Sequence, residues 1–274
     1  WDEAADGISG RISALVEKYG PESLASYTGN PLAFNTTAGP AISSFLIKNQ
    51  IRTNFSSGTQ DCTNKFAGSE AFFGSSTIHP IPDIGNTDFL LIFGSNPRIS
   101  HMSFVSIADP IAALRAAKKH GAKIRFVDPR ENESIKGIGE LVQVKPDTDV
   151  YLMAAILHHL HESGKFDDSY IQEHTDNIDG LIQFISNYSP DRVCETIGIS
   201  AQAIRNLADE FSSAESAAVY MSTGVNMGRQ GTIAYWLLFM LSVVTGNLDK
   251  PGGNIYSEGF YPAAKAGKSG SKEI

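Results

Sequence analysis

The stretch Phe89-Leu90-Leu91-Ile92-Phe93, which runs into Gly94-Ser95-Asn96-Pro97, decides the fold. Five consecutive apolar residues are typical of a strand that is buried on both faces, and the glycine and proline that follow end it. A helix over residues 108–120 and a second strand over 123–127 come next, at the spacing of a strand–helix–strand unit. Parallel strands joined by right-handed crossovers predict a Rossmann-like sheet.

The pattern extends in both directions from this unit. Further strands are expected at 24–27, 141–144 and Ala217–Met221. Residues 53–64 are rich in Ser, Thr, Asn and Gly and are interpreted as a loop. Helices are expected at 2–19, 38–51, 66–73, 149–163, 168–175, 178–186, 190–195, 200–211 and 230–245, and Ser200 is a favourable N-cap.

Composition excludes several classes of protein. The 274 residues contain 22 Lys and Arg against 30 Asp and Glu, a net charge of −8, with no basic cluster to hold nucleic acid. The longest apolar stretch, 236–244, is far shorter than the ~20 residues of a membrane span. The two cysteines, Cys62 and Cys194, cannot form a disulfide framework or a four-cysteine cluster, and Cys194 is interpreted as a small buried apolar residue.

Small polar or acidic residues follow each confident strand. Ligands bind at the carboxyl ends of strands in open parallel sheets, so these loops form the candidate binding edge. Neither the GxGxxG nor the GxxxxGK[ST] pattern occurs, which favours a nucleotide-bearing ligand of another kind. The candidate residues are Gly94, Ser95, Asn96, Asp128, Arg130, Asp147, Asp149, Gly224 and Asn226.

Each residue type fits a part of such a ligand. Asp128 can accept hydrogen bonds from a ribose diol, and Asp149 can accept two parallel N–H groups from a guanine. Gly94 and Gly224 would let the backbone approach a phosphate. Structural roles are the alternative: Asp149 as an N-cap, Asp128 as a turn former before proline, and Asn96 in an Asx turn.

The histidines form a weaker signal. On a helix His158 and His161 share a face and His159 points away, and no carboxylate or cysteine completes a metal site, so a solvated helix face is favoured. His79 and His101 lie near strand ends and are better placed for an active-site cleft, although a structural role is favoured for each.

Five segments, in order along the chain, resemble the molybdopterin oxidoreductase family, which includes enzymes of the dimethyl sulfoxide reductase, formate dehydrogenase and nitrate reductase types. The chain opens on WDEA, and later strands end in IFGSNP and FVDPR. The segment 145–149, KPDTD, is similar to the family's RPGTD, with Asp147 in place of the usual glycine. The segment 246–253 resembles its TGNxxxPGG pattern.

The resemblance implies a cofactor and a metal ligand. In this family a molybdenum or tungsten ion is held by the dithiolenes of two molybdopterin guanine dinucleotides and by one protein side chain. The resemblance places that ligand in the segment 61–65, where Cys62 is the first choice and Asp61 the second. A soft thiolate suits a metal already bound to sulfur, and an ordinary buried thiol is the alternative for Cys62.

The resemblance also implies an architecture. We expect an α/β fold of two Rossmann-like domains with mainly parallel sheets, one domain built from 1–56 and 215–274 and the other, 57–214, inserted. The chain resembles the central part of such an enzyme, so a [4Fe–4S] cluster is expected in a segment before it and a β-barrel domain after it. We therefore expect the isolated chain to be inactive.

The function implied is oxygen-atom or hydride and electron transfer on a small-molecule substrate, with electrons leaving through an iron–sulfur partner or subunit. Cys62 would be the residue at the reacting metal. Two alternatives stay open: a non-catalytic scaffold relative of the large subunit of respiratory NADH dehydrogenases, and an unrelated nucleotide-binding α/β module. Family members occur in the cytoplasm and the periplasm, and we expect a cytoplasmic location.

Overall fold

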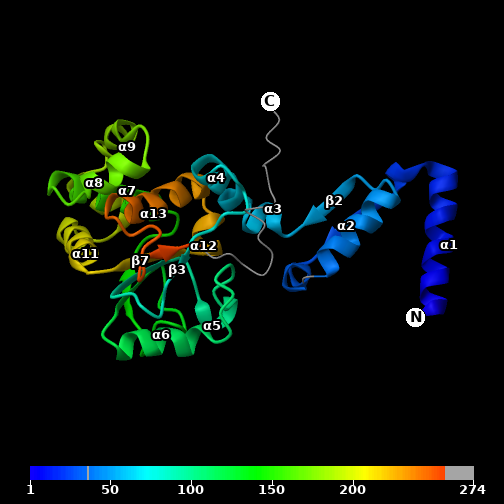
Figure 1. The fold of residues 1–274 in the computed structure, drawn as a ribbon, viewed down its shortest axis with the longest axis horizontal. Coiled ribbons are helices and arrows are strands. Elements are labelled where there is room, and N and C mark those ends of the chain that lie inside the picture. Colours follow the sequence, from blue (N-terminus) through cyan, green and yellow to red (C-terminus); the bar gives the residue numbers. More distant parts are fainter. Residues whose placement is uncertain (36, 257–274) are drawn as a thin grey trace. The chain divides into compact units, whose positions relative to one another are not determined.

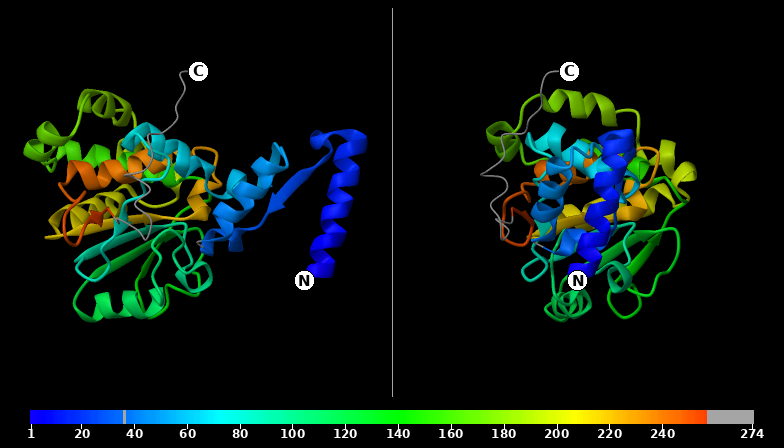
Figure 2. Two further views of the ribbon diagram at one scale, coloured as in Figure 1. Left: turned by 45° about the vertical axis from the view of Figure 1, so that its right-hand side comes forward. Right: turned by 90° about the vertical axis from the view of Figure 1, so that its right-hand side faces the viewer.

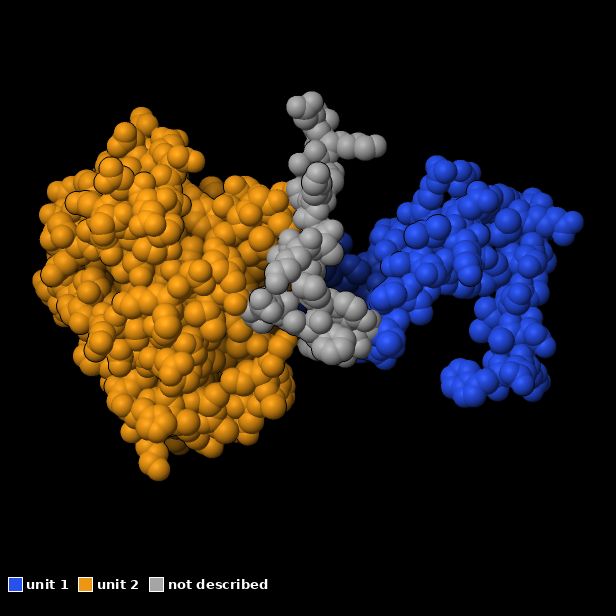
Figure 3. Space-filling model, in the orientation of Figure 1, with its two compact units in different colours: residues 1–63 blue, residues 64–274 orange. Residues whose placement is uncertain are grey.

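The computed structural model describes residues 1–35 and 37–256. The chain divides into two compact units, Trp1–Thr63 and Asn64–Ile274 (Figure 3). Each unit is described by itself below. No helix in the described ranges is long and apolar enough to cross a membrane.

A four-stranded parallel sheet forms the centre of the second unit. Its strands are β4 (Phe89–Phe93), β5 (Lys123–Asp128), β6 (Glu140–Gln143) and β7 (Ala217–Met221), in the order β6-β5-β4-β7. Every residue of β4 and β7 is buried, as the apolar runs predicted. Because β5 and β6 continue to one side of β4 and β7 lies on the other, the direction of the strand order reverses between β4 and β7.

Helices cover both faces of this sheet (Figures 1 and 2). On one face α6 packs with Leu114 and Ala117 against Leu90, Ile92 and other apolar residues of the strands. On the other face α7, α11 and α13 form the larger core, in which α13 is buried almost all round. The helices of this unit are α4 (Thr63–Phe73), α5 (Pro97–Ser100), α6 (Pro110–Lys119), α7 (Asp149–Glu162), α8 (Asp168–His174), α9 (Ile178–Ile185), α10 (Pro190–Ile197), α11 (Ala201–Ser213), α12 (Thr223–Asn226) and α13 (Gly231–Val244).

Side-chain caps start three of these helices. The Asp109 carboxylate accepts the N–H of Ala112, Asp167 accepts that of Tyr170, and the Ser200 hydroxyl accepts that of Ala203. Each contact satisfies a backbone donor that has no partner within its helix. The predicted N-cap at Ser200 is confirmed.

The exposed edge of β7 is covered by the segment that follows α13. A short antiparallel pair, β3 (Ile81–Pro82) and β8 (Asn254–Ile255), brings Asn254 beside β7. The Asn247 side chain accepts the N–H of Ala217 at 3.0 Å. The two asparagines of the segment 245–254, Asn247 and Asn254, therefore have a structural role, because they satisfy backbone groups of an edge strand.

The first unit is built from α1, β1, α2 and β2, with short turns between them. Strands β1 and β2 pair in parallel, so residues 53–56 are a strand although the sequence indicated a loop. The four residues do not form an apolar run, and their strand depends on pairing with β1, which no local pattern reveals. Its helices and strands are α1 (Asp2–Tyr19), β1 (Ala25–Thr28), α2 (Ala38–Lys48), β2 (Thr53–Ser56) and α3 (Gly58–Asp61). Two short 3-10 helices, Pro21–Ser23 and Asn30–Phe34, lie before and after β1.

The α/β class with parallel sheets is confirmed. The expected domains, 1–56 with 215–274 and 57–214, stay a prediction. In the structure β7 pairs with β4, and the boundary between the two compact units follows Thr63 in the sequence. Within the segment 215–274, residues 257–274 lie outside the described residues.

Candidate functional site

Two glycines meet where the strand order reverses. The Gly224 N–H donates to the Gly94 carbonyl at 3.1 Å, and the Gly94 N–H donates to the Val127 carbonyl at 2.9 Å. A Cβ on Gly224 would lie 2.6 Å from the Gly94 oxygen, and one on Gly94, at φ +53°, would lie 2.8 Å from the Val225 nitrogen. The ends of β4 and β7 are thus packed backbone against backbone, and α12 begins where the sequence indicated a loop.

Asp128 is buried at the end of β5 and holds the neighbouring loop. One carboxylate oxygen accepts the N–H of Arg130 at 2.9 Å, and the other accepts the side-chain amide of Asn132 at 2.9 Å. The same amide donates to the Ser95 carbonyl, so Asp128 and the loop after β4 are joined through one residue. The turn-forming role of Asp128 is present, and it places the carboxylate at the carboxyl edge of the sheet.

Both polar atoms of the Asn96 side-chain amide form hydrogen bonds. Its nitrogen donates to Glu133 at 2.6 Å and its oxygen accepts from the Ser134 hydroxyl at 2.6 Å. Arg130 lies 3.6 Å from the same Glu133 carboxylate and is largely exposed. These contacts fix the loop after β4 against the loop after β5.

Asp149 is the first residue of α7 and one of three carboxylates at this edge. Thr148 is the N-cap of α7, so the alternative of Asp149 as the N-cap does not hold. Burial, and then the charges of Asp128 and Asp147, raise the pKa of Asp149 to about 6. A carboxylate that is mostly buried and not neutralised by a cation is typical of binding sites.

Asp147 contacts a residue that sequence reasoning did not single out. Its carboxylate accepts the Arg229 N–H at 2.9 Å and lies 3.5 Å from the Nε of the same residue. Asp147, Asp149, Val225 and Gly228 line a small hollow at this point. The sequence did contain one indication of this contact: Asp147 stands where the family has glycine, and a carboxylate at a binding edge is often paired with a basic residue.

Two buried polar atoms at this edge have no hydrogen-bond partner among the residues that the structure describes, Ser95 Oγ and Asn226 Oδ1. Asn226 is 2% exposed, and its backbone carbonyl accepts from Asn64 at 2.6 Å. Buried polar groups are nearly always paired in native proteins, so these two atoms make the edge a candidate for binding a polar ligand. The candidate residues in the second unit, from Gly94 to Asn226, are therefore gathered at one edge and leave acceptors unused.

Asp61 and Cys62 belong to the first unit. Asp61 ends α3, and Cys62 is the C-cap of that helix and the residue directly before α4. The Cys62 side chain is half-buried, and its N–H donates to the Gly58 carbonyl at 3.0 Å. The assignment of either residue as a metal ligand stays a prediction.

The helix histidines make contacts of their own. His159 pairs with Asp209 at 2.9 Å and His161 lies 3.5 Å from Glu162, while the Nδ1 of His158 is buried. Within the described ranges, no group of three or more His, Cys, Asp or Glu residues could hold a metal. His101 ends α5 in the left-handed conformation and is exposed.

His79 lies among aromatic rings, one of them from α13. Its Nδ1 is 2.9 Å from the Tyr235 hydroxyl, and the rings of Phe66 and Phe104 flank it. Burial, and then the charge of Lys65, lower the pKa of His79 to about 4. These contacts favour a neutral, structural histidine.

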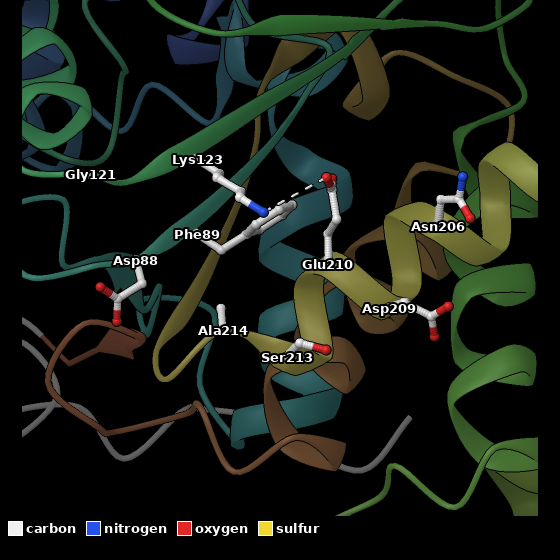
Figure 4. A pocket seen from close by; sticks show the side chains of 9 residues that line it. All are labelled: Asp88, Phe89, Gly121, Lys123, Asn206, Asp209, Glu210, Ser213 and Ala214. Atoms are coloured by element: carbon white, nitrogen blue, oxygen red, sulfur yellow. Dashed lines mark ion pairs between the residues drawn. The ribbon is translucent and has the colours of Figure 1, made fainter.

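A larger cavity, of about 650 Å³, lies at the opposite end of the strands (Figure 4). Asp88, just before β4, and Lys123, at the start of β5, line it together with residues of α11. Its basic group is already paired, since Lys123 lies 4.0 Å from Glu210. The amino ends of parallel strands are also not where such folds bind ligands. The carboxyl edge is therefore the candidate site.

The chain is similar to known proteins over most of its length. The family model described as molybdopterin oxidoreductase matches residues 1–268. Formate dehydrogenase H of Escherichia coli is 29% identical over 92% of this chain and 34% of its own length. A nitrate reductase of Symbiobacterium thermophilum is 27% identical over 96% of this chain and 36% of its own length.

A solved structure shows the same fold. Acetylene hydratase from Pelobacter acetylenicus superimposes with a TM-score of 0.72 at 21% identity, covering 90% of this chain and 32% of that one. The chain thus spans about a third of the length of the relatives it matches. It belongs to the molybdopterin oxidoreductase family, which implies a molybdenum or tungsten pterin cofactor.

Proposed function

We propose that this chain is the central part of a molybdenum or tungsten oxidoreductase and that the carboxyl edge of the β6-β5-β4-β7 sheet binds a guanine dinucleotide of the pterin cofactor. The observation that carries the proposal is the convergence of Asp128, Asp149 and the Asn226 amide oxygen, which has no partner among the described residues, near the reversal of strand order. When bound, the cofactor supplies oxygen-atom or hydride and electron transfer on a small-molecule substrate; the chain supplies binding and orientation.

Each residue of the edge has a role in that binding. The ionised Asp149 carboxylate accepts the ring N–H and the exocyclic amine of the guanine, two parallel donors that adenine does not offer. Asp128, already fixed by Arg130 and Asn132, accepts from the ribose. The Asn226 amide oxygen, buried beside Gly224, accepts from a ligand N–H or O–H.

The metal ligand is proposed in the segment before α4. Cys62 is the first choice because a thiolate matches a sulfur-bound metal, and Asp61, its neighbour, is the second. The bis-pterin form of the cofactor and an iron–sulfur cluster outside this chain are part of the same proposal. A relative, the F420-dependent formate dehydrogenase 2 of Methanococcus maripaludis, is named as an alpha subunit, which supports an electron-transfer partner subunit here as well.

The two alternatives fit less well. A scaffold needs no unpartnered acceptor at the ligand edge, whereas Asn226 Oδ1 is buried without a partner among the described residues. Family membership over residues 1–268 disfavours an unrelated nucleotide-binding module.

The test is to express the parent protein with the regions that flank this chain, purify it without oxygen, and measure molybdenum, tungsten and released GMP by mass spectrometry. We expect one metal ion with about two GMP molecules per chain, as a bis-pterin cofactor requires. Folded protein that contains neither metal nor GMP would contradict the proposal and leave the scaffold.

The ligand assignment needs separate variants. Cys62→Ala is expected to change the sulfur coordination seen by X-ray absorption, while Cys194→Ala, the other half-buried cysteine, leaves it unchanged. If Cys62→Ala leaves the X-ray absorption spectrum unchanged and Asp61→Ala loses an oxygen ligand, Asp61 is the metal ligand instead.

A further inference from the structure

Asp147 occupies a backbone position that suits glycine. Its φ is +64°, in the left-handed region that a residue with a Cβ adopts at a cost, and the family has glycine there. A strained residue persists when the contacts of its side chain hold it. The question is therefore what the Asp147 carboxylate does.

The carboxylate joins two loops that are far apart in the sequence. It accepts the backbone N–H of Arg229 at 2.9 Å, and its other oxygen lies 3.5 Å from the Arg229 Nε. Gly228 makes room for it, since a Cβ there would lie 2.7 Å from the Asp147 oxygen. The loop between β6 and α7 thus holds the Arg229 backbone and side chain in the loop between α12 and α13.

The surroundings of this contact are negatively charged. Asp128 and Asp147 are close enough to Asp149 for their charges to act on it, so three carboxylates share the edge. Two basic residues nearby are engaged elsewhere: Arg130 lies against Glu133, and Lys145 Nζ donates to the Glu195 carbonyl at 2.7 Å. Arg229 also forms an ion pair, with Asp147, but the contact is made through Nε and the side chain is 89% exposed, so the terminal nitrogens of its guanidinium stay accessible to a ligand.

A nucleotide phosphate is anionic and would be repelled by three carboxylates without a nearby cation. A guanidinium offers several N–H donors in a geometry that matches phosphate oxygens. We propose that Arg229, positioned by Asp147, is a phosphate-binding residue of the guanine nucleotide site. This inference rests on the proposed nucleotide function of the edge.

The test measures binding of two probes, GMP and guanosine, to the 274-residue chain by titration calorimetry. Arg229→Gln is expected to weaken GMP binding about tenfold, the size of one charged hydrogen bond, and to leave guanosine binding unchanged. Arg229→Lys, which keeps the charge, should recover part of the loss. Arg115→Gln, which removes an exposed arginine of α6, is the matched control and should bind both probes as the wild type does.

The role of Asp147 is tested by coupling. In an Asp147→Gly background, which restores the family's residue, Arg229→Gln should weaken GMP binding less than threefold because the side chain is no longer held. A full tenfold effect in that background would overturn the positioning role.

The other outcomes separate the two proposals. If the wild-type chain binds GMP and Arg229→Gln binds it equally well, or loses guanosine to the same extent, the phosphate contact is wrong while the nucleotide site stands. If the wild-type chain binds neither probe, the proposed nucleotide site itself fails and this inference falls with it.

Discussion

The side chain of Asn254 hydrogen-bonds both backbone polar groups of Val219: its oxygen accepts the Val219 N–H at 2.8 Å and its nitrogen donates to the Val219 carbonyl at 2.9 Å. Asn254 is fully buried and also accepts from the Ser242 hydroxyl. One side chain thus replaces a neighbouring strand at the edge of β7, the strand that ends at the candidate site.

Asn254→Ala is expected to lower the free energy of unfolding by about 3–5 kcal/mol, because it leaves two buried backbone groups of Val219 without partners. Urea unfolding followed by circular dichroism measures the loss. Asn206→Ala, an exposed asparagine of α11, should change stability by less than about 0.5 kcal/mol. Equal stabilities of the two variants would show that the edge of β7 is satisfied in another way.

Gly224→Ala should destabilise the second unit by about 2–4 kcal/mol and weaken GMP binding, because the new Cβ would sit 2.6 Å from the Gly94 carbonyl oxygen. The neighbour is backbone and cannot rotate away. Gly10→Ala in α1, where a Cβ meets nothing within 4 Å, should instead stabilise its helix by about 0.5–1 kcal/mol. Thermal unfolding and calorimetric binding of both variants provide the check, and an unperturbed Gly224→Ala would mean that the two loops separate readily.

Guanosine binding should depend on the ionisation of Asp149. Because its pKa is raised to about 6, the carboxylate loses its charge below that pH, and guanosine affinity should fall as pH drops from 7 to 5. Guanosine is the right probe because it has no phosphate that titrates in this range. Asp149→Asn should bind weakly at every pH between 5 and 7; a wild-type pH profile in that variant would exclude Asp149 as the titrating group.

The same shift affects stability with a known sign. The pKa of Asp149 in the folded chain lies above its ordinary value of 3.8, so this residue costs stability increasingly as pH rises from about 4 to about 6. Asp149→Asn should therefore be more stable than the wild type at pH 7 and nearly equal to it at pH 3.5. Urea unfolding at these two pH values tests the expectation.

The titration of His79 makes stability depend on pH with the opposite sign. Its folded pKa of about 4 is below the ordinary 6.5, so the neutral ring stabilises the fold fully above pH 6.5, and that contribution is lost as pH falls toward 4. The loss is at most about 3 kcal/mol, by the free energy of a pKa shift of this size. His79→Gln should show a smaller fall in unfolding free energy between pH 7 and 4.5 than the wild type, whereas the exposed His120→Gln should show the wild-type fall. Identical falls in all three proteins would contradict the assignment.

Local patterns predicted most of the second unit. The runs at Phe89–Phe93 and Ala217–Met221 became fully buried strands, and Ser200 became the N-cap of α11. These features depend on residues close together in the chain, so periodicity and capping chemistry suffice to find them. The strand at Thr53–Ser56 was missed because its existence depends on pairing with β1.

Some features of the candidate site could likewise be predicted from the sequence, and others could not. The sequence indicated Asp128, Asp149, Gly94 and Gly224, because strand ends and residue types show where a ligand edge lies. It did not reveal that the two glycines pack on one another or that Asp147 holds Arg229.

The sequence by itself determined the α/β class, the family and the edge of the sheet at which the polar residues gather, because apolar runs, caps and ordered motifs are local. Only the tertiary structure decided which carboxylates act electrostatically on Asp149, which buried amide oxygen has no partner within the described ranges, and which arginine lies beside Asp147. The contact of Asp147 with Arg229 joins residues 82 positions apart, and such contacts are fixed by the packing of the whole unit around its sheet.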